Sequence, residues 1–91
     1  MFIISKLDTL NNKVLIVDVE EEGDFMKAYE SLLDDILQYL EKPEDFSVKN
    51  LTKSRVQVYK KGYMGSLLAF VYEIHPFNEE ALKLVKDEQS D

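Results

Sequence analysis

The sequence predicts a single α+β domain, residues 1–91, in which a four-stranded antiparallel sheet packs against one long amphipathic helix. The expected element order is β-β-α-β-β-α, and the last element is a short C-terminal helix. Two patterns predict this class. Apolar and polar residues alternate in several short segments, as in strands, whereas one long segment between them has apolar residues spaced by three and four, as in a helix. The chain has no cysteine, so we expect one small core without disulfide bonds.

The first two strands are predicted at residues 2–7 and 14–19. The second of them is rich in β-branched residues, which favour strands. The polar turn between them contains Asn11 and Asn12, and asparagine tolerates the left-handed backbone conformations that tight turns require. These features are typical of a β-hairpin.

The second strand has apolar residues on both of its faces. Strict alternation of side chains predicts one face of Leu15, Val17 and Val19, and an opposite face of Val14, Ile16 and Asp18. Because both faces are partly apolar, we expect the second face to be covered as well, by a helix, the C-terminal tail or a partner subunit.

The long helix is predicted at residues 25–41. Asp24 is a suitable N-cap, because its carboxylate can accept hydrogen bonds from the free N–H groups of the first turn, and Pro43 follows the helix end. The apolar stripe of this helix comprises Phe25, Tyr29, Leu32, Leu33, Ile36, Leu37 and Leu40.

The second half of the chain is predicted to form another hairpin and a short helix. Residues 43–54 are polar and are expected to form a connector with room for a short helical turn. Strands are predicted at residues 55–60 and 66–75, joined by a turn with two glycines and ended by Pro76, since proline cannot donate to a strand ladder. A short helix is then expected at residues 79–87.

Negative charge is concentrated in the first half of the chain, which has a net charge of −7 overall. Residues 1–48 contain twelve acidic and four basic side chains, whereas residues 49–78 contain five basic side chains and a single acidic one. The tail, residues 79–91, is acidic again. A folded chain with this layout has an anionic side that repels nucleic acid and attracts basic protein surfaces.

No catalytic or cofactor motif is present in the sequence. His75 is the only histidine, whereas a zinc site usually needs several His or Cys ligands. Gly62 and Gly65 lie between two predicted strands and open no helix, so they do not form a phosphate-binding loop. Asp34 and Asp35 are adjacent on the helix and do not converge on one ion. We therefore expect a non-enzymatic protein with no metal ion and no cofactor.

The basic segment of the chain is a weaker candidate for a binding surface. With two nearby tyrosines it could bind single-stranded nucleic acid by charge and stacking, but the surrounding anionic protein opposes such binding. We therefore expect no direct contact with nucleic acid, and we expect these bases to pair with acids of the same chain or of a second subunit. They are Lys49, Lys53, Arg55, Lys60 and Lys61.

The acidic side is the stronger candidate. A DNA duplex carries one negative charge per ~1.7 Å of its axis, and DNA-binding proteins gain affinity by neutralising that charge and releasing counterions. Helical positions three or four apart lie roughly 5–6 Å from each other, which is similar to the spacing of neighbouring phosphates. We predict that eight carboxylates take the place of phosphates in a partner-binding surface. They are Glu20, Glu21, Glu22, Asp24, Glu30, Asp34, Asp35 and Glu41.

The acidic loop of residues 20–24, the helix with Asp34 and Asp35, the two hairpins and the chain length together resemble a known type of protein. They are similar to the small acidic DNA-mimic proteins of bacteriophages, and most nearly to the anti-restriction nuclease proteins (Arn) of T-even phages. The resemblance covers the whole chain in size, charge and element order. It implies a homodimer that occupies the DNA-binding surface of a host restriction endonuclease, and a nucleoid-associated protein as a further target. The basic residues between positions 49 and 61 depart from a uniformly anionic mimic.

The leading hypothesis is therefore a DNA-mimic inhibitor of a basic DNA-binding host protein. The N-terminus does not resemble a signal peptide and no apolar run reaches the ~20 residues that span a membrane. We expect no membrane association and a cytoplasmic location, in the host cell if the protein is phage-encoded. The alternative is a small adaptor or assembly module that docks through apolar surface and carries charge only for solubility. Its docking residues would be Phe46, Tyr59, Tyr63 and Phe77.

Overall fold

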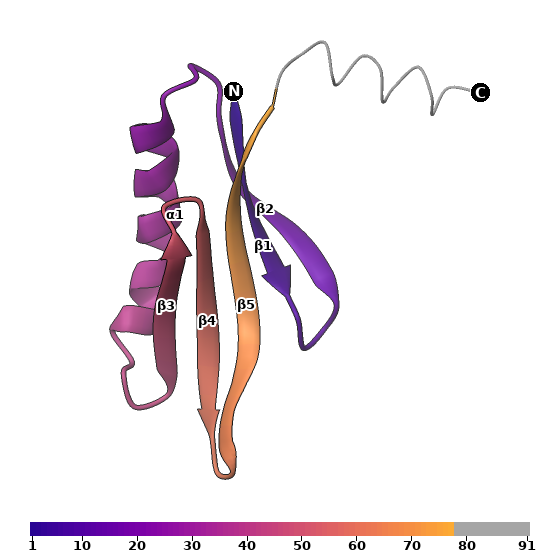
Figure 1. Ribbon diagram of the computed structural model, residues 1–91, viewed down its shortest axis with the longest axis vertical. Helices are drawn as coiled ribbons and strands as arrows, with labels where there is room; N and C mark the ends of the chain where they lie inside the picture. Colours follow the sequence, from indigo (N-terminus) through magenta and orange to yellow (C-terminus); the bar gives the residue numbers. More distant parts are fainter. Residues whose placement is uncertain (78–91) are drawn as a thin grey trace, which may run out of the picture.

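The structure, a computed structural model that describes residues 1–77, contains one five-stranded antiparallel sheet with a helix against one of its faces (Figure 1). The spatial order of the strands is β2-β1-β5-β4-β3, so that the first and last strands in sequence are neighbours. The elements are β1 (Phe2–Asp8), β2 (Lys13–Glu20), α1 (Phe25–Leu40), β3 (Phe46–Thr52), β4 (Arg55–Gly62) and β5 (Gly65–Pro76).

The expectation of four strands and two helices is wrong, because residues 1–77 form five strands and one helix. Residues 46–52, which fall in the predicted connector, form β3 and pair with β4 across a tight turn. β3 is an edge strand whose half-buried apolar side chains are only Phe46 and Val48, so its alternation is faint in the sequence. The short helix predicted at residues 79–87 lies outside the described residues.

The pairing of β1 with β2 contains a bulge that overturns the predicted faces of β2. Ile4 is opposite Asp18, whereas the next residue of β1, Ser5, is opposite Ile16. Val17 is therefore the extra residue, and a bulge of this kind reverses the alternation on one side of it. Directly opposed residues of antiparallel strands share a face. The helix side of β2 consequently holds Leu15, Asp18 and Glu20, and the other side holds Val14, Ile16 and Val19.

Helix α1 begins where the sequence predicts, with Asp24 as its N-cap, and its last residue is Leu40, followed by Glu41 as the C-cap. Its buried face differs from the predicted stripe. Leu37 and Leu40 are 48% and 52% exposed, because the face toward the sheet is centred on Leu32 and Ile36 and reaches Tyr39.

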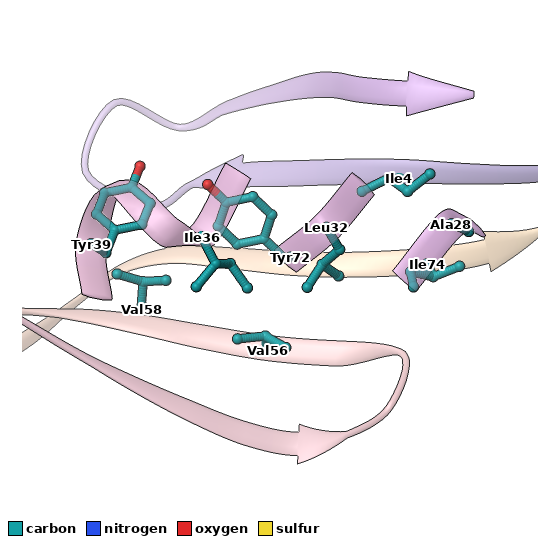
Figure 2. Packing of buried hydrophobic residues seen from close by; sticks show 9 residues of the cluster. All are labelled: Ile4, Ala28, Leu32, Ile36, Tyr39, Val56, Val58, Tyr72 and Ile74. Carbon is teal, nitrogen blue, oxygen red and sulfur yellow. The ribbon is translucent and has the colours of Figure 1, made fainter. Parts of the chain in front are cut away.

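The core lies between α1 and the helix side of the sheet, as Figure 2 shows. Side chains of α1 enter it from one side, and those of β1, β4 and β5 enter it from the other. Aromatic rings close its two ends: the ring centroids of Phe2 and Phe25 are 5.6 Å apart, and those of Tyr39 and Phe46 are 4.9 Å apart. The cluster consists of Ile4, Ala28, Leu32, Ile36, Tyr39, Val56, Val58, Tyr72 and Ile74.

Replacing Leu32 by alanine should lower the free energy of unfolding by about 2–5 kcal/mol, because the side chain is fully buried and leaves a cavity. Leu37→Ala is the matched control: it removes the same atoms from the same helix at a half-exposed position, and we expect a loss of about 1 kcal/mol or less. Urea denaturation measures both values. Equal losses for the two variants would contradict the assignment of the buried face.

Candidate functional site

An open groove runs between edge strand β2 and helix α1, and most of its lining residues are acidic. Two adjoining hollows form it, with volumes of about 270 and 360 Å³. The Ser31 hydroxyl on α1 donates a hydrogen bond of 2.7 Å to the Asp18 carboxylate on β2 and so connects the two walls. We call this feature the acidic groove; its charged and hydroxyl-bearing residues are Asp18, Glu20, Glu21, Glu22, Lys27, Ser31, Asp34 and Asp35.

Glu20 has an internal structural role, although it was predicted to contact a partner. Its side chain is 8% exposed. One carboxylate oxygen accepts the backbone N–H of Glu22 at 2.8 Å, and the other accepts that of Asp24 at 2.6 Å. These bonds hold the turn between β2 and α1, in which Gly23 adopts a φ of 76°, a conformation that favours glycine.

Two further predicted residues have partners at the start of α1. Asp24 caps the helix and accepts hydrogen bonds from the backbone N–H groups of Met26 at 3.0 Å and Lys27 at 3.4 Å. Glu22 forms an ion pair of 2.7 Å with Lys27, and the Glu22 carboxylate raises the pKa of the Lys27 ammonium. Both members of this pair are more than half exposed, so its contribution to stability is small.

Asp35 points toward the sheet and joins a polar network inside the helix–sheet interface. It accepts a hydrogen bond from the Tyr72 hydroxyl and lies 3.7 Å from the Lys6 ammonium. That ammonium donates a hydrogen bond of 2.6 Å to the Tyr39 hydroxyl and lies 4.4 Å from the centroid of the Phe70 ring. The carboxylate and the aromatic rings together offset the desolvation of a lysine that is only 14% exposed.

The remaining predicted residues, Glu21, Glu30, Asp34 and Glu41, are exposed. Within residues 1–77 there are two ion pairs, and neither involves any of these four carboxylates. Glu30 and Asp34 are one helical turn apart and share a face. Glu41 is at the other end of α1, close to a loop where the Lys61 ammonium donates a hydrogen bond of 2.6 Å to the Pro43 carbonyl oxygen. Glu21 and Asp34 thus line the acidic groove and Glu30 lies one turn from Asp34, whereas Glu41 lies apart from them.

Asp18 is the groove residue that sequence reasoning missed. Strict alternation placed it on one face with Val14 and Ile16, and only the bulge at Val17 turns it toward α1. No local pattern could have indicated this, because the bulge is a property of the pairing between β1 and β2.

Ser5 and His75 also meet, with 3.0 Å between the Ser5 hydroxyl oxygen and Nε2 of His75. Pairing of β1 with β5 brings them together, although they are 70 positions apart. A nucleophilic serine also needs a group that orients the histidine and donors for an oxyanion. In residues 1–77 His75 has no other side-chain hydrogen bond, so this contact by itself does not indicate catalysis.

The aromatic residues expected to dock an apolar partner are mostly engaged. Phe46 packs on Tyr39, the Tyr59 hydroxyl donates a hydrogen bond of 2.9 Å to the Gln57 amide oxygen, and Phe77 is half-buried beside Met1. Tyr63, at the turn between β4 and β5, is fully exposed. An apolar docking surface built from all four residues is therefore not assembled.

The basic segment lies on β3 and β4 and in the turn between them, at the opposite edge of the sheet from β2. Neither of the two ion pairs of residues 1–77 involves a base of this segment. Within the described residues, 1–77, no three His, Asp or Glu side chains are arranged to hold a metal ion. No helix in this part of the chain is long and apolar enough to cross a membrane.

No protein-family model matches the chain, and neither a curated protein nor a solved structure matches it. The likeness to phage DNA mimics therefore stays a prediction from size and charge, because the element order that also supported it is wrong.

Replacing Glu20 by alanine should lower the free energy of unfolding by about 1–3 kcal/mol, because two backbone N–H groups lose a charged acceptor whose side chain is buried. Glu21→Ala removes the neighbouring exposed carboxylate and should change it by about 0.5 kcal/mol or less. Thermal or urea unfolding of the two variants tests this difference, and a neutral Glu20→Ala would rule out the structural role.

The stability of the protein should fall at alkaline pH because of Tyr72. Burial, together with the hydrogen bond to Asp35, raises the pKa of the Tyr72 hydroxyl well above its ordinary value of 10.0. The unfolded chain therefore loses this proton first. The stabilising contribution is complete below pH 10 and declines above it, by about 1.4 kcal/mol per pH unit for one proton.

Urea unfolding between pH 8 and pH 11.5 measures this decline. Tyr72→Phe should start from a lower stability at neutral pH but show a shallower decline, because the ionising group is gone. Tyr63→Phe, at a fully exposed tyrosine, should decline like the wild type. If the slopes of wild type and Tyr72→Phe coincide, Tyr72 is not the source of the pH dependence.

Proposed function

We propose that this chain is a non-enzymatic DNA mimic that acts as an inhibitor in the host cytoplasm. It occupies the DNA-binding surface of a basic host protein, such as a restriction endonuclease or a nucleoid-associated protein. The observation that carries the proposal is the group of exposed carboxylates around the acidic groove that have no basic partner within residues 1–77. These are Asp18, Glu21, Glu30 and Asp34.

The position of these carboxylates supports binding to an extended basic surface. Glu30 and Asp34 are on α1, whereas Asp18 and Glu21 are on or next to β2, across the groove. The partner therefore meets two neighbouring lines of negative charge held by rigid elements, rather than a flexible acidic tail. Fixed backbone positions matter, because a segment whose backbone is already ordered loses less conformational entropy on binding.

Electrostatics also favour a protein partner over a nucleic acid. The groove contains one basic side chain, Lys27, and this residue is paired with Glu22. The bases of β3 and β4 are at the far edge of the sheet. A DNA-binding protein approaching the groove meets charge of the sign that its surface normally neutralises.

The rival reading, an adaptor that docks through apolar surface, has less support from the aromatic residues that it requires. Three of them, Phe46, Tyr59 and Phe77, are half-buried. Tyr63 is exposed together with Met64 and Leu67 at the β4–β5 hairpin. That small patch is the surface through which an adaptor would dock.

Binding to the target should depend steeply on salt and be displaced by DNA. The full chain, immobilised, is exposed to a host extract at low ionic strength, and retained proteins are challenged with duplex DNA or with increasing salt. A complex with several charge contacts should lose on the order of 10³-fold in affinity between 50 and 200 mM salt, by analogy with protein–DNA complexes. Retention that neither salt nor duplex DNA reverses would exclude mimicry.

The double variant Glu30→Lys and Asp34→Lys should weaken binding of a retained target by at least about tenfold, an effect of about 1.4 kcal/mol. Glu44→Lys with Asp45→Lys is the matched control. It changes the net charge by the same amount, but in the exposed loop after α1. Calorimetric titration with the purified target compares them. Equal weakening by both double variants would mean that binding depends on net charge alone. Tyr63→Ala is titrated in the same way, and if it weakens binding more than either double variant, the result favours the adaptor.

A further inference from the structure

Strand β2 is an edge strand with an apolar, exposed segment. It pairs with β1 on one side and has no strand on its other side within residues 1–77 (Figure 1). Val14, Leu15 and Ile16 are 67%, 50% and 60% exposed. Leu15 is on the helix side, so its exposure means that α1 does not cover this part of β2. Unpaired edges with exposed apolar residues on both faces readily add another strand.

The structure limits the free part of this edge to the first half of β2. Beyond the bulge, the backbone N–H of Val19 donates a hydrogen bond of 2.8 Å to the Asp18 carboxylate, and is therefore not available to a further strand. The segment before the bulge, Lys13 to Ile16, has no such protection by its own side chains.

The charge pattern of β2 is complementary to itself in one direction. The strand begins with Lys13, continues with apolar residues and ends with Asp18 and Glu20. Two copies running antiparallel place the basic start of each beside the acidic end of the other. Two parallel copies would instead bring like charges together. A second copy of this chain thus fits the edge in both its apolar and its charged parts.

We propose that β2 is the interface of a symmetric dimer in which the β2 strands of two copies pair antiparallel and the two sheets become one. Leu15 of each copy is opposite Leu15 of the other on the helix side, and Val14 is opposite Ile16 on the other face. This register keeps equivalent faces together and uses the bulge-free part of the strand. Lys13 then lies beside Val17 of the second copy, within side-chain reach of its Asp18.

This inference does not depend on the proposed function, but it affects the acidic groove. In the dimer both copies of α1 lie on the same side of a continuous sheet, and the two acidic grooves flank the shared β2 strands. A closed two-fold arrangement also removes the exposed β2 edge.

Sedimentation equilibrium of the full chain over a range of concentrations provides the first test. We expect a dimer of twice the 10.6 kDa chain mass. Ile16→Lys should raise the dissociation constant at least about 100-fold, because it places an unpaired charge in the apolar centre. Met64→Lys, at a residue that is 97% exposed on another hairpin, should change it less than about threefold. A monomer at all concentrations, or a dimer insensitive to Ile16→Lys, overturns the proposal.

Cysteine substitution tests the register, since the natural chain contains no cysteine. Opposed residues of antiparallel strands have Cα atoms about 4.5–5.5 Å apart, which is within the range that a disulfide can join. Leu15→Cys should therefore oxidise rapidly to a covalent dimer. Ile16→Cys and Met64→Cys should do so at least about tenfold more slowly, and equal rates for the three variants would refute the register.

A charge exchange tests the direction of pairing. Lys13→Asp and Asp18→Lys should each weaken the dimer, and the double exchange should restore at least half of the lost affinity when circular dichroism shows an unchanged fold. No recovery in a folded double variant contradicts antiparallel pairing through these two residues.

Discussion

Burial of one face of α1 against the helix side of the sheet is the constraint on which the other features depend. Leu32 and Ile36 are fully buried against β1, β4 and β5, and this packing fixes the rotation of the helix about its axis. The helical period then places Glu30 and Asp34 toward solvent. The same contact leaves the first half of β2 uncovered, because α1 approaches β2 near Asp18, where Ser31 bonds to it. The acidic surface and the open strand edge are both consequences of one packing arrangement.

Adjacent carboxylates on the helix consequently have opposite roles. Asp34 is exposed beside the groove, whereas Asp35, about 100° further round the helix, contacts Tyr72 and the ammonium of Lys6. A buried charge is retained only where it is paired and hydrogen-bonded, and Asp35 meets both conditions. Removing Lys6 or Asp35 alone would leave the other charge without its partner inside the interface. The network therefore ties the first hairpin to the helix, and it pairs one of the carboxylates that line the acidic groove with a lysine of the same chain.

Local features of this fold, including the hairpins of β1 with β2 and of β4 with β5, were predictable from the sequence, whereas the exact register of the strands was not. The N-cap Asp24 and the start of α1 depend on neighbouring residues, so the pattern indicated them correctly. β3 was missed because an edge strand with few buried side chains lacks a clear period. The bulge at Val17 and the inward turn of Asp18 depend on the register in which β2 pairs with β1, which the sequence of β2 alone does not specify. Among the eight predicted carboxylates, Asp24 was identified as a backbone cap from the sequence. Glu20 was not, because its burial at the end of β2 accompanies the pairing with Phe2 of β1.

Salt acts in opposite directions on the two interactions proposed for this chain. Attraction between the acidic groove and a basic target weakens as ions screen it. Two copies of the chain, each with a net charge of −7, repel one another, and screening relieves that repulsion while leaving the apolar contacts of Val14, Leu15 and Ile16 nearly unchanged. The two contacts between Lys13 and Asp18 weaken with salt, but they are few beside the overall like charge. A dimer that persists while the target dissociates at high salt would therefore separate the strand-edge interface from the electrostatic one, because a single acidic surface cannot respond to ions in both ways.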